Sequence, residues 1–285
     1  MFIHLAVKSL LYRKGAILLT IATMSISIFV MLGVDHIRHQ AKSSFSNSIS
    51  GIDLIVGSRT GNLNLLLYSV FRMGEPTNNI SWQSYQRIKN KEEISTAIPI
   101  SLGDSHQGYR VLGTTPDYFT VFAYGNKQPL RFEHGNKFKT VFELVLGAKV
   151  AKKLGYKLGD SIVLSHGLGR TSFKKHDYLP FKVSGILKAT GTPVDQTLYV
   201  SLQGIEAVHL SKPSDIKHLL KTPELTLLEA QSLTPKSVTA ILLSLDSKIE
   251  TFTVQRNINS NSGEPLSAIL PGVALSQLWQ TMSSF

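Results

Sequence analysis

The chain has 285 residues and no cysteine, so neither disulfide bonds nor thiol chemistry contribute to it. Its 30 lysines and arginines outnumber its 19 aspartates and glutamates, and the formal net charge is +11. The basic residues are scattered among acidic ones, without the basic patches and interleaved aromatic residues of a nucleic-acid interface. We therefore expect no nucleic-acid partner, and a solvated surface close to anionic lipid headgroups accounts for the charge better.

Residues 1–15 have the pattern of an amphipathic helix. Apolar residues recur at helical spacing at Ile3, Ala6, Val7, Leu10 and Leu11, whereas His4, Lys8 and Tyr12 fall on another face. Such a helix is suited to lying in a membrane interface. We expect it on the cytoplasmic side, with Gly15 as the bend into the next segment.

Residues 16–34 form an uninterrupted apolar run without a charge. A helix of this length spans a hydrocarbon core of ~30 Å. Lys8, Arg13 and Lys14 precede the run and favour a cytoplasmic N-terminus, although Arg38 and Lys42 follow it. A signal peptide is the alternative, but its apolar region is shorter and ends in a small-residue cleavage site that is missing here. We expect one uncleaved span in the cell inner (plasma) membrane, with the bulk of the chain periplasmic.

Small residues line one face of this predicted span. Ala16, Thr20, Thr23 and Ser27 are spaced four, three and four residues apart. A stripe of this kind lets transmembrane helices approach closely, so we predict that these four residues form a helix-packing face. The alternative is that the hydroxyl groups bond back to carbonyls of their own helix.

The remainder of the chain alternates between strand and helix signals, so we predict a mixed α+β domain. The membrane helix is expected to continue through 35–48. Strands are predicted over 51–58, 95–104, 107–115 and 237–245, and helices from Ser81 to Ile88, after Thr115-Pro116-Asp117 and through Asn257. Residues 143–164 predict a strand, a helix ended by Gly155, a turn at Gly159-Asp160 and a strand. Residues 181–189 and 196–202 are predicted to form a strand pair before a helix near 203–210, and the chain ends in a strand and the start of a helix.

The motifs that carry chemistry are mostly missing. No phosphate-binding G-x-x-x-x-G-K-[ST] motif is present, and Gly167-Leu168-Gly169 lacks the third glycine of a dinucleotide site. Gly103-Asp104-Ser105-His106 resembles the start of an esterase motif, but no later D-x-x-H accompanies it, and Gly-Asp-Ser is also ordinary turn chemistry. Neither His36 with His39 nor His166 with His176 has the spacing of a metal site. We therefore predict no catalytic, cofactor-binding or metal-ligating residue, and no cofactor.

Several segments together resemble one known family. LAVKSLLYRKGAILLTI resembles the opening of permeases of the MacB/LolCDE/FtsX type of ABC transporter. VLGTTPDYF, ELVLGAKVAKKLGYKLGDSI, FKVSGILKATGTPVDQTLYVSL and GEPLSAILPGVALSQLWQ resemble, in the same order, the MacB-like extracytoplasmic core domain. The resemblance implies a core domain over 35–275, with one α+β subdomain inserted into the other at about 113–215. In MacB these subdomains are called porter and sabre.

The resemblance also implies partners and a mechanism. A separate ATPase subunit binds permeases of this type at a cytoplasmic coupling helix, and the permease works as a homo- or heterodimer. Nucleotide-driven movement of the extracytoplasmic domain would then act on a substrate such as a lipoprotein, a peptide or a drug.

The chain departs from the family at its end, because family permeases carry further transmembrane helices after the core domain. Residues 276–285 are expected to be the start of a stalk or of a second transmembrane helix. We expect this segment to be incomplete because the chain is either a fragment or a truncated gene product. Two other functions stay open. One is a lone membrane-anchored binding module, and the other is a membrane-anchored hydrolase with Ser105 as its nucleophile.

Overall fold

The computed structural model describes residues 12–46, 48–166, 179–210, 225–230, 233–261 and 263–283. The chain divides into two compact units, Met1–Phe45 and Ser46–Phe285. Most of the amphipathic helix predicted over 1–15, the Gly167-Leu168-Gly169 motif and His176 lie outside the described residues.

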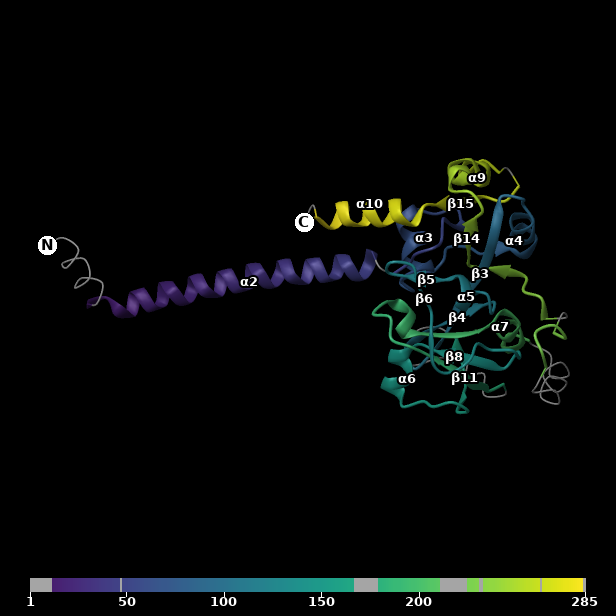
Figure 1. Ribbon diagram of the computed structural model, residues 1–285, viewed down its shortest axis with the longest axis horizontal. Helices are drawn as coiled ribbons and strands as arrows, with labels where there is room; N and C mark the ends of the chain where they lie inside the picture. The colour runs from purple at the N-terminus through teal and green to yellow at the C-terminus, as the bar shows by residue number, and fades with distance from the viewer. Residues whose placement is uncertain are drawn as a thin grey trace. The chain divides into compact units, whose positions relative to one another are not determined.

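The described residues of the first unit lie almost entirely in helix α2 (Lys14–Ser46), drawn in purple in Figure 1. Within it, the 24 residues Lys14–Ile37 have a mean hydropathy of 2.4 and the length to cross a membrane. None of the most apolar window is buried, so the apolar side chains have no protein core to pack against. The prediction of one helix over 16–34 that continues outward past residue 35 is confirmed.

The second unit combines short helices with strands of two to thirteen residues. Its first elements are β1 (Leu54–Ser58), α3 (Asn62–Ser69), β2 (Ile80–Ser81), α4 (Trp82–Lys89), β3 (Ile94–His106), β4 (Tyr109–Thr114), α5 (Tyr118–Val121), β5 (Ala123–Tyr124), β6 (Gln128–Pro129), β7 (Phe132–Gly135), β8 (Glu143–Leu146) and α6 (Ala148–Leu154). The later ones are β9 (Ser161–Ile162), β10 (Ser165–His166), β11 (Phe181–Leu187), η1 (Pro193–Gln196), β12 (Thr197–Ser201), α7 (Leu202–Val208), β13 (Ser237–Val238), β14 (Ala240–Leu245), η3 (Lys248–Glu250), α9 (Thr251–Asn259), β15 (Leu266–Ile269) and α10 (Pro271–Ser283).

One mixed sheet runs through the whole unit, in the order β15-β1-β14-β3-β4-β12-β8-β11-β7 (Figure 1). Most neighbours are antiparallel, but β12 runs parallel to β4 and β11 runs parallel to β8. The long strand β3 pairs with β14 through residues 94–100 and with β4 from Ser101 onward. The predicted α+β class is therefore confirmed, and β3 is the strand that both halves of the sheet share.

Among the described residues, two hydrophobic clusters belong to the two halves of the sheet. The first contains residues of β1, β14, β15, α4 and α9, including Leu54, Ile241 and Val254. The second contains residues of β8, β11, β12, α6 and α7, including Leu144 and Phe181. Apart from Leu202, the first cluster draws on residues 54–97 and 238–268, whereas the second draws on residues 111–233.

Local signals in the sequence set several element boundaries as predicted. The Ser81 hydroxyl accepts a hydrogen bond from the Ser84 N–H at the start of α4. Gly155 ends α6 in the left-handed region, at φ 75°. The turn between β3 and β4 differs from the prediction: Gln107 and Gly108, assigned to a strand over 107–115, both have positive φ, as a two-residue hairpin turn requires.

The predicted pairing of 181–189 with 196–202 is wrong. β11 and β12 occur in these segments, but β8 lies between them and pairs with both. The 3-10 helix η1 and the turn before it carry the chain past β8 instead of closing a hairpin. A strand preference is local, whereas the choice of partner depends on which strand reaches the same edge of the sheet.

Candidate functional site

The esterase-like motif does not form a catalytic site. Ser105 is buried in β3, opposite Arg110 of β4 and Ser165 of β10. The Nδ1–H of His106 donates to the Val163 carbonyl at 2.8 Å, and its Nε2 lies 2.8 Å from the Tyr156 hydroxyl. Because both ring nitrogens are engaged, His106 is not placed as a base for Ser105.

No group of three or more metal-ligating side chains gathers among the described residues. A cavity of about 30 Å³ lies between α4 and α9, lined by residues that include Ser84, Ile88 and Ile258. Small-molecule sites usually occupy about 300–1,000 Å³, so this cavity does not hold a substrate. The features that bear on function are instead the strands and contacts through which the domain connects to the rest of the chain.

The first and last strands of the domain are hydrogen-bonded neighbours. We call β1 and β15 the terminal strand pair. They run antiparallel, with Ile55 opposite Ile269 and Ser58 opposite Leu266. β1 follows α2 along the chain, and β15 precedes α10. Because the two strands are antiparallel, the chain enters β1 and leaves β15 at the same end of the pair.

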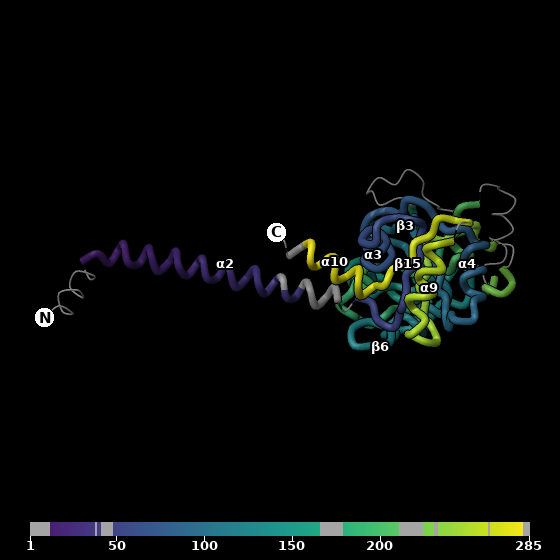
Figure 2. Tube along the Cα trace, turned by 90° about the horizontal axis from the view of Figure 1, so that it is seen from above, coloured from purple at the N-terminus to yellow at the C-terminus, as the bar shows by residue number. Residues whose placement is uncertain are grey.

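Helix α9 lies beside β15 (Figure 2), and its side chains contact the outer edge of the terminal strand pair. The Ala268 N–H donates to Asn259 Oδ1 at 2.6 Å, and the Gln255 side-chain amide donates to the Ala268 carbonyl at 3.0 Å. The Asn259 amide N–H also donates to that carbonyl, at 3.4 Å. These amides take the place of a further strand at Ala268, so the main-chain groups of this residue are paired at the edge.

The face of β1 is held by α3. A Cβ atom added to Gly57 would lie 2.5 Å from Leu65 Cδ1 and 2.6 Å from the Tyr68 hydroxyl, so only glycine permits this approach. Burial raises the pKa of Tyr68 to about 12, and the hydroxyl stays neutral in the physiological range. Helix α3 also packs against α10. The terminal strand pair is thus clamped both at its edge and on its face.

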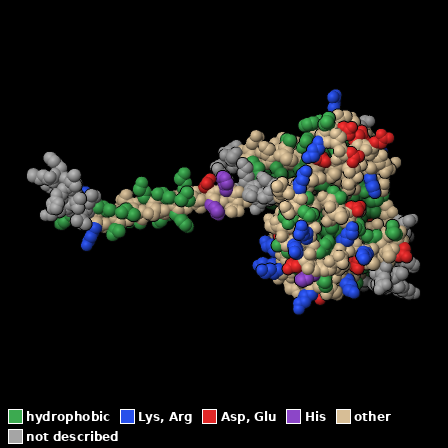
Figure 3. Space-filling view, viewed as in Figure 1, with side chains coloured by type: hydrophobic (Ala, Val, Ile, Leu, Met, Phe, Trp, Pro, Cys, Tyr) green, Lys and Arg blue, Asp and Glu red, His purple; other side chains and the backbone are tan. Residues whose placement is uncertain are grey.

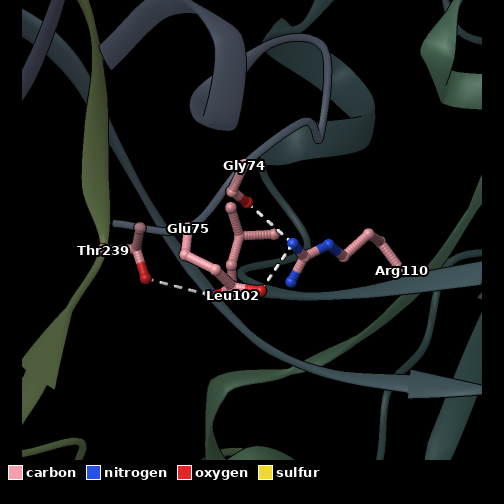
Figure 4. A network of polar contacts seen from close by, with 5 residues as sticks. All are labelled: Gly74, Glu75, Leu102, Arg110 and Thr239. Atoms are coloured by element: carbon pink, nitrogen blue, oxygen red, sulfur yellow. Dashed lines mark hydrogen bonds and ion pairs between the residues drawn. The ribbon is translucent and has the colours of Figure 1, made fainter. Parts of the chain in front are cut away.

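A polar joint connects α3 to the other half of the sheet, and Figure 4 shows its residues. The Arg110 guanidinium on β4 donates from Nη2 to the Gly74 carbonyl at 2.7 Å and to Glu75 Oε1 at 2.8 Å. The Arg110 side chain is 6% exposed, whereas that of Glu75 is 63% exposed. The joint ties the loop after α3 to the strand that begins the second half of the sheet.

Thr239 marks the point at which β3 changes partner (Figure 4). Its N–H donates to the Ile100 carbonyl at 2.8 Å, and its hydroxyl accepts from the Leu102 N–H at 3.0 Å. Because β14 pairs with β3 only as far as Ile100, it offers no main-chain acceptor to the Leu102 N–H, and the Thr239 hydroxyl accepts this hydrogen bond instead. Thr239 is fully buried, so its hydrogen bonds hold the two halves of the sheet in register.

The predicted packing stripe lies on one face of α2. Its hydroxyls bond within the helix: Thr20 Oγ1 donates to the Ala16 carbonyl, Thr23 Oγ1 to the Thr20 carbonyl and Ser27 Oγ to the Thr23 carbonyl, each at 2.9 Å. This is the arrangement that the alternative expected. It satisfies the hydroxyls without preventing close approach of another helix, and the packing face stays a prediction.

Sequence reasoning did not single out Asn259, Arg110 or Thr239. Asn259 ends α9, two residues beyond the helix predicted through Asn257 and one turn after Gln255, and that pair of amides was the only available signal. Arg110 and Thr239 occupy positions in or beside strands that read as ordinary sheet residues. Their roles depend on which loop and which strand lie opposite them.

Comparisons with known proteins bear on the whole chain. A family model described as the MacB-like periplasmic core domain matches residues 17–260. No curated protein sequence matches the chain. Among solved structures, the periplasmic region of MacB from Actinobacillus actinomycetemcomitans is similar at 12% identity with a TM-score of 0.48, over 84% of this chain and 95% of that one. The extracellular domain of the noncanonic ABC-type transporter YknZ from Gram-positive bacteria is similar at 14% identity with a TM-score of 0.41, over 76% of this chain and 98% of that one.

Proposed function

Because the chain belongs to the MacB-like periplasmic core domain family, we propose that it is the membrane-anchored part of an ABC-transporter permease that passes ATP-driven motion to an extracytoplasmic substrate. The observation that carries the proposal is the terminal strand pair. A domain that transmits displacement needs its two membrane-side connections joined by a stiff element, and β1 and β15 are joined strand to strand. The substrate would be a lipoprotein, a peptide or a drug.

The proposal includes a division into two subdomains, with the inserted one at about 113–215 within a core domain over 35–275. The two hydrophobic clusters support it, since one is built from residues 111–233 and the other almost wholly from residues before and after that range. Residues 276–285 would lead toward a stalk or a second transmembrane helix. Lys14–Ile37 would be the span, with a cytoplasmic N-terminus and the packing stripe Ala16, Thr20, Thr23 and Ser27 facing other helices.

The partners in this proposal are a separate ATPase subunit, a second permease subunit and membrane lipid. The chain carries no phosphate-binding G-x-x-x-x-G-K-[ST] motif, so ATP hydrolysis would come from the partner. Purification of the full chain from its native membranes in mild detergent should therefore recover vanadate-sensitive ATP hydrolysis. An anchored chain that recovers no such activity would contradict the transporter assignment and favour a lone binding module.

Single cysteines test the orientation, since the chain has none of its own. Ile249 is 90% exposed on the domain, and Tyr12 is 92% exposed ahead of the span. A membrane-impermeant maleimide should label Ile249→Cys in intact cells and should label Tyr12→Cys only after the cells are broken. The reverse pattern would overturn the proposed topology.

A further inference from the structure

Basic side chains gather on one side of the domain. Six exposed residues make up what we call the basic band: Lys127, Arg131, Lys149, Lys152, Lys153 and Lys188. Within segments 117–133, 148–157 and 188, all of them described, the exposed carboxylates are Asp117 and Glu133. Positive charge therefore exceeds negative charge on this surface, although the two signs are mixed along the sequence.

Backbone contacts arrange the band as a continuous path from the point where the chain enters the domain. Ser50 donates its N–H to the Ala123 carbonyl at 2.9 Å, which seats the incoming chain on β5. Lys127 lies in the turn between β5 and β6. Arg131 follows β6, and its carbonyl accepts the Lys188 N–H at 2.8 Å. A few residues after Lys188, η1 packs against α6.

The far end of the band is one face of α6. Lys149, Lys152 and Lys153 are three and four residues apart, so their side chains share a face, while Val150 and Ala151 are buried on the other. No acidic residue in α6 offsets them. Like charges at this spacing repel one another, and an anionic surface would remove that repulsion.

Within the domain, α6 lies on the same side as α10. Figure 1 shows α6 at the edge of the domain from which α10 projects. In Figure 3, blue side chains gather around this edge, whereas red ones gather at the opposite end near α9. Exposed Glu92, Asp246 and Glu250 contribute to that acidic end.

We infer that the basic band is a docking surface for anionic phospholipid headgroups of the membrane in which the chain is anchored. The inference rests on the proposed function, because it requires the α2 anchor. Charge complementarity favours headgroups, and the band begins where the membrane-anchored segment joins the domain. Each lysine near an anionic leaflet raises the equilibrium constant for docking about fivefold, and only within about a Debye length of 8–10 Å.

The test places a fluorophore beside α6 in the full-length protein. Leu158→Cys puts a unique cysteine just after the helix, at a residue that is 45% exposed. The labelled protein is reconstituted into nanodiscs of neutral phosphatidylcholine, or of phosphatidylcholine with phosphatidylglycerol, each carrying a headgroup quencher. We expect about threefold stronger quenching in the anionic discs, lost when about 1 M salt shortens the Debye length to about 3 Å.

Matched variants separate the band from net charge. Replacement of Lys149, Lys152 and Lys153 by glutamine should abolish the difference between anionic and neutral discs. Replacement of Lys89, Lys236 and Lys248, which are exposed outside the band, removes the same charge and should leave the difference intact. Thermal melting of both triple variants checks that each is folded, and a third variant of the band, Lys127→Gln with Lys188→Gln, should weaken the difference without touching α6.

The experiment distinguishes a failure of this inference from a failure of the proposed function. Protein that co-elutes with neutral and anionic discs alike but shows equal quenching in both would overturn the inference and leave the anchor intact. An equal loss of quenching in the two matched triple variants would also overturn it. Protein that does not co-elute with either disc would overturn the membrane anchor, and with it both the proposed function and this inference.

Discussion

At the scale of single residues, His106 shows how burial makes the last residue of a strand pH-dependent. The imidazole sits between the Val163 carbonyl and the Tyr156 hydroxyl, with one nitrogen donating and the other accepting. Burial lowers the pKa of His106, against a smaller opposing effect of the Val163 hydrogen bond. A second proton would place two donors in a site built for one donor and one acceptor.

The sign of the resulting pH dependence follows from linkage. The folded pKa of His106 lies below its ordinary value of 6.5, so the unfolded chain binds the proton first as the pH falls. Stability from this group is complete above pH 6.5 and declines as the pH falls below it. We expect His106→Asn to lose less Tm than the wild type between about pH 7.5 and about pH 5.5. The exposed control His134→Gln should keep the wild-type dependence, and an identical profile for all three proteins would contradict this account.

Gly147 is a second residue whose role is steric. A Cβ atom there would overlap the Val194 carbonyl and the Asp195 backbone, where η1 crosses the start of α6. Gly147→Ala should therefore destabilise the domain by about 1–3 kcal/mol in urea unfolding, because backbone cannot move aside as a side chain can. Gly103→Ala is the matched control, since nothing lies within 4 Å of its added Cβ. Equal urea midpoints for Gly147→Ala and Gly103→Ala would show that the backbone of η1 moves aside without a loss of stability.

At the scale of elements, the outer edge of β15 depends on one amide. Asn259→Leu leaves the Ala268 N–H without its acceptor in a residue that is 2% exposed. We expect a loss of about 1–3 kcal/mol, the cost of an unpaired buried group. The exposed Asn257→Leu on the same helix should cost much less. Chemical denaturation measures both changes, and comparable losses would mean that water replaces the amide at this edge.

Elements were predicted with uneven success, and the reasons are physical. α4 and α6 carry caps whose chemistry acts within a few residues, and these were predicted from the sequence, whereas the turn residues Gln107 and Gly108 were assigned to a strand. The pairing of β11 with β12 was predicted wrongly, because each of these strands pairs with β8 instead, and β8 lies far from both in the sequence. Strands such as β5 and β6 are too short to show the alternation of apolar and polar residues, with a period of two, by which a strand is recognised in a sequence.

At the scale of the whole molecule, the terminal strand pair should stay closed while the protein works. Val56 lies opposite Ala268, and the Ala268 N–H and carbonyl face α9, so the two residues form a pair without mutual hydrogen bonds. The Cα atoms of such pairs lie about 4.5 Å apart, within disulfide range. Val56→Cys with Ala268→Cys should therefore crosslink on mild oxidation, and the yield in native membranes should be the same with and without ATP and vanadate. A yield that falls on adding nucleotide would show that the pair opens during transmission.

The matched control moves one cysteine by a single position. Val56→Cys with Ser267→Cys places the two side chains on opposite faces of the sheet, since successive strand residues point to opposite faces. It should not crosslink under the same conditions. A high yield in this control would indicate local unfolding rather than a native pair.

The sequence by itself determined the apolar helix, the α+β class, several element boundaries and the family to which the chain belongs. The first three follow from composition, from periodicity or from local caps, which act within one element, whereas the family follows from the resemblance of several segments, in order, to known permeases. Only the tertiary structure decided that β1 and β15 are neighbours, that Arg110 reaches Gly74 and Glu75, and that Asn259 covers the edge of β15. These contacts join residues far apart along the chain, and their partners are selected by the packing of two hydrophobic clusters around the shared strand β3. No local pattern encodes that selection, because it depends on the free energy of the assembled sheet.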